Sequence, residues 1–150
     1  MAKRGFSLVE VLVVLGIVGI LAGLVAFVDV NNYRGDAFRA EVSALGGALQ
    51  TARADALNNI NQHAHGVAIH PGGYDGYVIY EGDSYATRDT TRDEFAKAGY
   101  GVSFSPSSPT EIVFTQLSGN ASYDGDITLV DPNRGMTAAI TINHEGRISW

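Results

Sequence analysis

The apolar run near the N-terminus constrains this chain more than any other part of its sequence. Residues 11–28 read VLVVLGIVGILAGLVAFV and contain no polar side chain, and the basic residues Lys3 and Arg4 precede them. At 1.5 Å per residue, a helix over residues 6–28 would measure about 35 Å, enough for a hydrocarbon core of roughly 30 Å. The run therefore predicts a membrane-spanning helix over residues 6–30, with the N-terminus in the cytoplasm.

Two ordinary interpretations of this run are a cleaved secretory signal and a plain single-span anchor. A signal would use the basic start, the apolar run and a small-residue site such as LAGLVA (21–26), but its apolar region is usually only about 7–15 residues long. Neither interpretation gives a role to Glu10, an acid within an apolar segment, and such acids tend to mark function.

The stretch KRGFSLVE (3–10) resembles the type IV prepilin motif, in which a basic leader ends in glycine before an apolar helix. The glycine is Gly5, the next residue is Phe6, and the acid at the fifth position of the helix is Glu10. The resemblance implies that a prepilin peptidase removes residues 1–5, methylates the new amine of Phe6, and leaves the helix in place for assembly.

The resemblance also implies a role for Glu10 in that assembly. Its carboxylate would meet the charged amine of Phe6 on a neighbouring subunit. Two opposite charges in an apolar bundle cost far less when paired than alone, so the pair would penalise wrong stagger between subunits. The alternative is that Glu10 lies in the lipid headgroup region.

The segment after the apolar run has the spacing of an amphipathic helix. Apolar residues recur every three or four positions, which predicts a helix over residues 36–62 whose stripe packs on a sheet, with a bend at NNYRGD (31–36). Gly46 and Gly47 weaken such a helix, and a sheet that approaches closely would account for them. The tripeptide RGD (34–36) is interpreted as a chance match. The stripe consists of Phe38, Val42, Leu45, Leu49, Ala52, Ala56 and Ile60.

The remainder reads as short strands joined by turn-rich segments. Gly, Asn, Asp and Ser separate apolar runs, which predicts an antiparallel sheet or a small two-sheet sandwich, with a short helix at TRDEFAKA (91–98). The predicted strands are 66–70, 77–81, 100–104, 110–116, 126–130, 137–143 and 147–150. The fold class is therefore α+β, a long N-terminal helix on a β-rich head of residues 31–150.

This order of elements, with EIVFTQLSGNAS (111–122) and the ending AITINHEGRISW (139–150), resembles the GspH/FimT family of minor pseudopilins and minor pilins. In that family the chain tends to end with a strand, a Gly-Arg turn and a last short strand, and the turn is here Gly146 and Arg147. Some members that serve DNA uptake have basic residues at this end. The net charge of this chain is −6, so a nucleic-acid partner is not expected.

Side chains of types that bind metals gather in two places in the sequence. His63, His65 and His70 are close in sequence, but no set ligand spacing follows them. The loop YDGDITLVDPN (123–133) has oxygen ligands of the kind that calcium prefers, although its spacing differs from an EF-hand. Turn residues are the expected role, and no cofactor is predicted. The acids of that loop are Asp124, Asp126 and Asp131.

No nucleotide loop or Ser/His/Asp arrangement is readable, so an enzyme is not expected. The sequence predicts a filament subunit anchored in the bacterial inner membrane with a periplasmic head, most specifically a minor pseudopilin of a type II secretion system. Its partners would be prepilin peptidase, other pilin subunits, the assembly platform and, before assembly, membrane lipid. The alternatives are a minor or major pilin of a type IV pilus and a membrane-tethered periplasmic binding domain that does not polymerise.

Overall fold

The computed structural model describes the backbone of residues 7–26, 30–74, 76–99 and 101–150, with side chains described outside residues 24–34. The chain divides into two compact units, Met1–Gly35 and Asp36–Trp150. The predicted leader, residues 1–5, lies outside the described residues, and the predicted boundary between assembly helix and head stays a prediction.

The first unit contains α1 (Leu8–Ala26). The predicted membrane span of residues 6–30 is described only in part, because Phe6 and residues 27–29 lie outside the description. Among the described residues, no helix has the length and apolar character needed to cross a membrane.

The second helix, α2 (Val30–Leu57), continues without interruption through residues 31–36, the place of the predicted bend. The predicted helix over 36–62 is wrong at its end, because Asn59 adopts a left-handed backbone conformation with φ of 55°. A 3₁₀ turn, η1 (Ile60–Gln62), follows instead of further α-helix. Two adjacent asparagines at 58–59, which tolerate this conformation better than most residues, account for the early stop.

The predicted apolar stripe of α2 is confirmed over its helical part. Its six members from Phe38 to Ala56 are buried, and Leu45 and Leu49 have no exposed surface. Ile60 is the exception, with 43% of its surface exposed, because it lies beyond the end of the helix.

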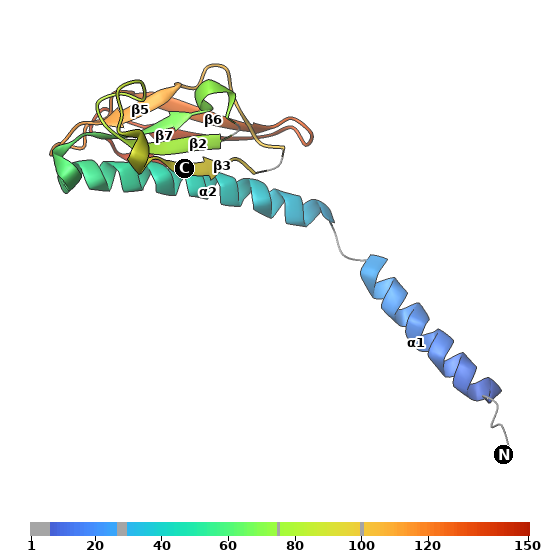
Figure 1. Ribbon diagram of the computed structural model, residues 1–150. Helices are drawn as coiled ribbons and strands as arrows, with labels where there is room; N and C mark the ends of the chain where they lie inside the picture. The colour runs from blue at the N-terminus through green and yellow to red at the C-terminus, as the bar shows by residue number, and fades with distance from the viewer. Residues whose placement is uncertain (1–6, 27–29, 75, 100) are drawn as a thin grey trace, which may run out of the picture. The chain divides into compact units, whose positions relative to one another are not determined.

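The head contains two four-stranded antiparallel sheets (Figure 1), so the antiparallel pairing is confirmed and the second of the two predicted arrangements, with two sheets, is the one found. The first sheet has the order β3 (Glu94–Lys97), β2 (Gly76–Glu81), β1 (His65–Ile69) and β5 (Glu111–Phe114). The second has the order β4 (Ser103–Phe104), β6 (Gly125–Asp131), β7 (Met136–Ile142) and β8 (Ile148–Ser149). A short 3₁₀ turn, η2 (Pro71–Gly73), lies in the connection between β1 and β2, as the PGG sequence there suggests.

The short helix predicted over residues 91–98 is wrong. A 3₁₀ turn, η3 (Thr90–Arg92), is capped by the Asp89 carboxylate, and strand β3 begins two residues later. Phe95 pairs with Val78 of β2, so hydrogen bonding along the edge of the first sheet overrides the weak local preference for helix.

One hydrophobic core joins α2 to both sheets. Leu45 and Leu49 of α2 belong to the same buried cluster as Phe114 of the first sheet and Ile127 and Ile140 of the second. Fully burying each such side chain contributes about 1.5–3 kcal/mol. The head is thus organised around the inner face of α2, which Figure 1 shows running along the strands.

Candidate functional site

The N-terminal end of α1 carries the one part of the predicted assembly site that the structure describes. Gly5 and Phe6, the predicted cleavage and methylation positions, lie outside the described residues. Ser7 caps the helix, since the backbone N–H of Glu10 lies 3.2 Å from the Ser7 hydroxyl oxygen and 3.1 Å from the Ser7 carbonyl oxygen. The cap places Glu10 in the first turn of α1, where a negative charge is favourable for the helix dipole.

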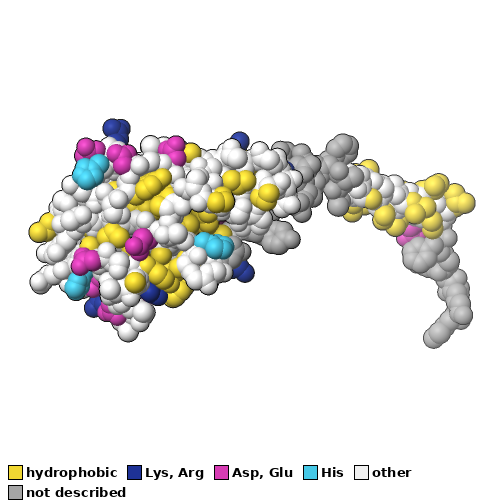
Figure 2. All heavy atoms as spheres, turned by 90° about the horizontal axis from the view of Figure 1, so that it is seen from above, with side chains coloured by type: hydrophobic (Ala, Val, Ile, Leu, Met, Phe, Trp, Pro, Cys, Tyr) yellow, Lys and Arg dark blue, Asp and Glu magenta, His cyan; other side chains and the backbone are white. Residues whose placement is uncertain are grey.

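Apolar side chains surround the described part of α1 and are exposed to solvent (Figure 2). Their exposed fractions run from 49% at Val11 to 77% at Leu8. A helix that is apolar on all sides must be covered by other chains or by lipid. The first unit therefore presents a surface that is incomplete by itself.

The C-terminal turn predicted at Gly146 and Arg147 joins the end of the chain to α2. Gly146 has φ of 74°, and its N–H donates to the Asn143 carbonyl at 2.8 Å. The N–H of Arg147 donates to the Asn143 side-chain oxygen at 2.7 Å, while the Arg147 side chain is exposed. The glycine is required here because the left-handed conformation and the close neighbours both disfavour a Cβ.

Arg53 of α2, which the sequence did not single out as a candidate, binds this turn. Its Nη2 donates to the Glu145 carbonyl at 3.0 Å, and its Nε donates to the Gly119 carbonyl at 3.4 Å. No spacing rule links positions so far apart in the chain, so the sequence offered no signal for this contact. The Gly-Arg turn of the resemblance is thus a structural joint between α2 and two loops.

The three aspartates weighed as calcium ligands have separate roles. Asp124 is exposed, Asp126 accepts a hydrogen bond from the Thr141 hydroxyl at 2.7 Å, and Asp131 accepts one from the Asn133 N–H at 3.0 Å. The described parts of the chain contain no group of three or more metal-ligating side chains. Turn and cross-strand bonding therefore accounts for Asp126 and Asp131.

The three histidines are likewise spread over different contacts. His65 Nε2 lies 3.2 Å from the Ile60 carbonyl oxygen, whereas His63 Nε2 lies 4.0 Å from a carboxylate oxygen of Glu81. His70 has φ of 52° at the start of the β1–β2 connection.

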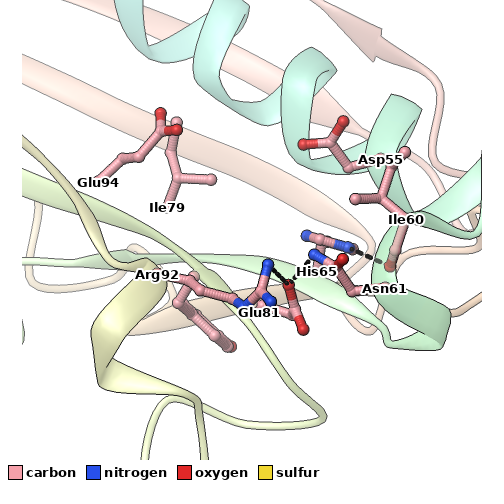
Figure 3. A pocket seen from close by; sticks show the side chains of 9 residues that line it. Asp55, Ile60, Asn61, His65, Ile79, Glu81, Arg92 and Glu94 are labelled. Atoms are coloured by element: carbon pink, nitrogen blue, oxygen red, sulfur yellow. Dashed lines mark hydrogen bonds and ion pairs between the residues drawn. The ribbon is translucent and has the colours of Figure 1, made fainter.

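A polar pocket of the head lies around Glu81, at the end of β2 (Figure 3). The Glu81 side chain is only 7% exposed and accepts a hydrogen bond from Asn61 Nδ2 at 2.6 Å. Arg92 Nη1 lies 3.6 Å from the same carboxylate oxygen. Sequence reasoning missed Glu81 because nothing in YVIYE distinguishes its last residue from an ordinary strand end. The cavity of about 170 Å³ is lined by Asp55, Ile60, Asn61, His65, Ile79, Tyr80, Glu81, Arg92 and Glu94.

A second polar network covers the outer face of the first sheet. The Tyr80 hydroxyl donates to Glu111 at 3.2 Å, and the N–H of Tyr85 donates to the same oxygen at 2.8 Å. Burial raises the pKa of the Tyr80 phenol, and the Glu111 carboxylate raises it further. Arg88 lies over the Tyr85 ring and pairs with Asp93, which raises the pKa of the Arg88 guanidinium. These groups fasten the loop after β2 onto the sheet.

Comparison with known families identifies the N-terminal segment. Residues 1–26 match the family model of the prokaryotic N-terminal methylation motif. Comparisons with curated proteins and with solved structures gave no match. The motif is typical of type IV pilin-like proteins, and it implies a membrane-anchored precursor, processing by prepilin peptidase and assembly with other pilins. The N-terminal motif therefore supports a type IV pilin-like protein.

Proposed function

We propose that this chain is a structural subunit of a type IV pilus-like filament, most specifically a minor pseudopilin of a type II secretion system. The observation that carries the proposal is the methylation motif of residues 1–26, which includes α1, together with the exposed apolar side chains of the described part of that helix. A segment of this kind is an assembly surface once it is retained after processing.

The energetic argument rests on the side chains of α1. Covering one exposed leucine or valine with a neighbouring helix gains about 1.5–3 kcal/mol, so a whole apolar helix supplies a large driving force for bundling. Apolar burial alone does not fix the stagger between neighbouring helices. Glu10 fixes that stagger, because its carboxylate is stable in an apolar bundle only where the amine of Phe6 from the adjacent subunit meets it.

A subunit of this kind has a defined location in the cell. The precursor lies in the inner membrane with its N-terminus in the cytoplasm and its head in the periplasm, and the assembly platform then extracts it into a filament. The role of the head is mechanical rather than catalytic. The polar groups described around Glu81 and Glu111 support this, because their bonds join one part of the fold to another.

Membership of the GspH/FimT family is part of the proposal and has its own support. The head follows the expected order of a long helix, a first strand and a final pair of strands, and the Gly146–Arg147 turn lies just before β8. A minor or major pilin of a type IV pilus is the second candidate, because the methylation motif is equally compatible with it. A non-polymerising periplasmic domain is the third, and it leaves Glu10 without a role.

The first experiment determines the mature N-terminus by mass spectrometry of the chain purified from its host. The proposal expects a methylated Phe6 as the first residue. An intact Met1, or a start beyond residue 22, would overturn the assignment to the pilin class.

The second experiment separates polymerising from non-polymerising roles. Glu10→Ala is compared with Glu145→Ala, which removes an exposed acid of the head. We expect sheared filament fractions to lose the Glu10→Ala subunit and to retain the Glu145→Ala subunit. If both variant subunits are incorporated equally, Glu10 has no role in setting the register between subunits.

The third experiment distinguishes secretion from pilus function by deleting the gene in the host. A pseudopilin predicts that exported proteins accumulate in the periplasm while surface pili persist. Loss of surface pili with normal secretion would favour the pilus alternative.

A further inference from the structure

The connection between α2 and β1 contains three residues in the left-handed backbone region. In the 58–64 turn, Asn59, Asn61 and Gln62 have φ values of 55°, 53° and 63°. Asparagine tolerates this region better than most residues, whereas Gln62 is unusual there, and such conformations persist where surrounding contacts hold them. Backbone bonds within the turn and side-chain contacts from outside it keep the turn in place.

Glu81 is one of several residues that make polar contacts with this turn, since the Gln116 side-chain amide donates to the Asn59 side-chain oxygen and the Gly82 N–H donates to the Ala64 carbonyl at 2.8 Å. Glu81 Oε2 accepts from Asn61 Nδ2 at 2.6 Å, and its Oε1 lies 4.0 Å from His63 Nε2. At 7% exposure, the carboxylate is well shielded from water, so its hydrogen bonds are stronger than those of a surface acid.

The same residue holds a second segment, the 82–93 loop between β2 and β3. Arg92 Nη1 lies 3.6 Å from Glu81 Oε2, and the backbone N–H of Asp89 donates to the Glu81 carbonyl at 3.1 Å. The carboxylate oxygen that accepts from Asn61 is thus also the one nearest Arg92. Figure 3 shows both side chains converging on Glu81 from their separate elements.

We propose that Glu81 is a coupling carboxylate that joins the 58–64 turn and the 82–93 loop into one cooperative unit, so that the two segments open together and before the rest of the head. The turn supplies stored conformational strain, and Glu81 supplies the restraint. Opening of the 58–64 turn weakens the hold on the 82–93 loop, and the reverse, because Asn61 and Arg92 share one acceptor oxygen.

The surroundings of Glu81 allow this unit to open separately from the core. Glu81 lines two cavities of about 170 and 390 Å³, so the side chains around it are less closely packed than those of the core. Segments with few buried apolar contacts open at lower free energy than the core strands. The charged or titratable groups that face the cavities are Asp55, His63, His65, Tyr80, Asp83, Arg88, Asp89, Arg92 and Glu94.

The test is amide hydrogen exchange of the full chain in detergent micelles, read for three segments: the 58–64 turn, the 82–93 loop and the β6–β7 hairpin. In Glu81→Gln we expect exchange to rise at least about tenfold in the turn and the loop, as for loss of a charge-assisted hydrogen bond, and to stay unchanged in β6–β7. A uniform rise in all three segments, or no rise in the turn and loop, would overturn the proposal.

Asn61→Ala tests the coupling itself, because it removes a contact of the turn and leaves the loop's own residues intact. Cooperative opening predicts faster exchange in the 82–93 loop as well as in the turn. Faster exchange in the turn alone would show two independent segments and would contradict the coupling.

Two further variants complete the design. Glu94→Gln removes an exposed acid of the same cavity and is expected to leave exchange unchanged, so a rise equal to that of Glu81→Gln would point to cavity charge instead. Gln62→Gly relieves the left-handed strain and is expected to restore protection in the Glu81→Gln background. If Gln62→Gly does not restore protection, backbone strain does not drive the opening, and that part of the proposal is wrong.

Discussion

The indole ring of Trp150, the last residue of the chain, lies directly over Gly46 in the middle of α2. A Cβ on Gly46 would stand 2.8 Å from atoms of the ring, closer than real Cβ contacts come. The adjacent Gly47 has no such neighbour within 4 Å. The sheet approach predicted for the two glycines is therefore wrong. A side chain from the C-terminus accounts for Gly46, and nothing described in the head accounts for Gly47.

This difference predicts opposite effects of the same substitution at adjacent positions. Gly47→Ala is expected to stabilise the head by about 0.5–1 kcal/mol, because alanine is the better helix former and space is open. Gly46→Ala is expected to destabilise it by about 1–2 kcal/mol, because the indole must move. Thermal unfolding of the two variants gives the comparison. Equal stabilisation by both would show that Trp150 does not pack on α2.

The C-terminal turn makes a second matched prediction. A Cβ on Gly146 would stand 2.1 Å from the Gly119 carbonyl oxygen and 2.7 Å from Arg53 Nε, in addition to the strain of φ at 74°. Gly146→Ala is expected to cost about 2–4 kcal/mol in unfolding free energy. The control is Gly135→Ala, which has φ of 65° but no atom within 4 Å, and strain alone should cost it about 1–2 kcal/mol. Denaturant unfolding measures both, and similar costs would rule out crowding at Gly146.

The ion pair of Arg88 and Asp93 should contribute far more to stability than a surface pair. Arg88 Nε lies 2.9 Å from Asp93, whose side chain is 2% exposed. Asp93→Asn leaves a largely buried guanidinium without its counter-charge, which should cost about 3–5 kcal/mol. Asp36→Asn, at the exposed pair with Arg39, should cost less than about 1 kcal/mol. Chemical unfolding of the two variants checks this, and equal losses would contradict it.

Tyr80 predicts a specific loss of stability in alkali. Burial, and then Glu111, raise the folded-state pKa of its phenol above the ordinary value of 10.0. A raised pKa means that the folded state holds the proton more tightly than the unfolded state. The contribution is therefore complete below about pH 10 and is lost as the pH rises above that value.

Ultraviolet titration of tyrosinate and unfolding measured against pH test this prediction. Tyr80→Phe should flatten the decline of stability above pH 10. The expectation fails if all seven tyrosines ionise in one step near pH 10 while the head is still folded.

Sequence periodicity predicted the parts of the fold that depend on local pattern. The stripe from Phe38 to Ala56 follows from burying one face of α2, and the buried positions of β5 and β6 alternate for the same reason, whereas β1 is buried throughout. The two errors in helix boundaries have different causes. Pairing with β2, which is distant in the sequence, made residues 94–97 a strand, whereas the local left-handed conformation of Asn59 ended α2 before Ile60.

The candidate sites also fall into two groups, those readable from contiguous residues and those formed only by folding. The motif around Gly5, Phe6 and Glu10 is readable from sequence because its residues lie close together in the chain, within residues 1–26. The joint made by Arg53 and the contacts of Glu81 are not readable, because each connects segments that only folding brings together.

The sequence alone determined that this chain begins with a methylation-type motif, continues as helix and ends as a strand-rich head, because these are local matters of charge, apolar spacing and turn residues. The tertiary structure alone decided what holds the head together. It placed Trp150 on Gly46, Arg53 on the C-terminal turn, and Glu81 between a strained turn and a loop. Such contacts depend on distances across the fold, which local pattern does not encode.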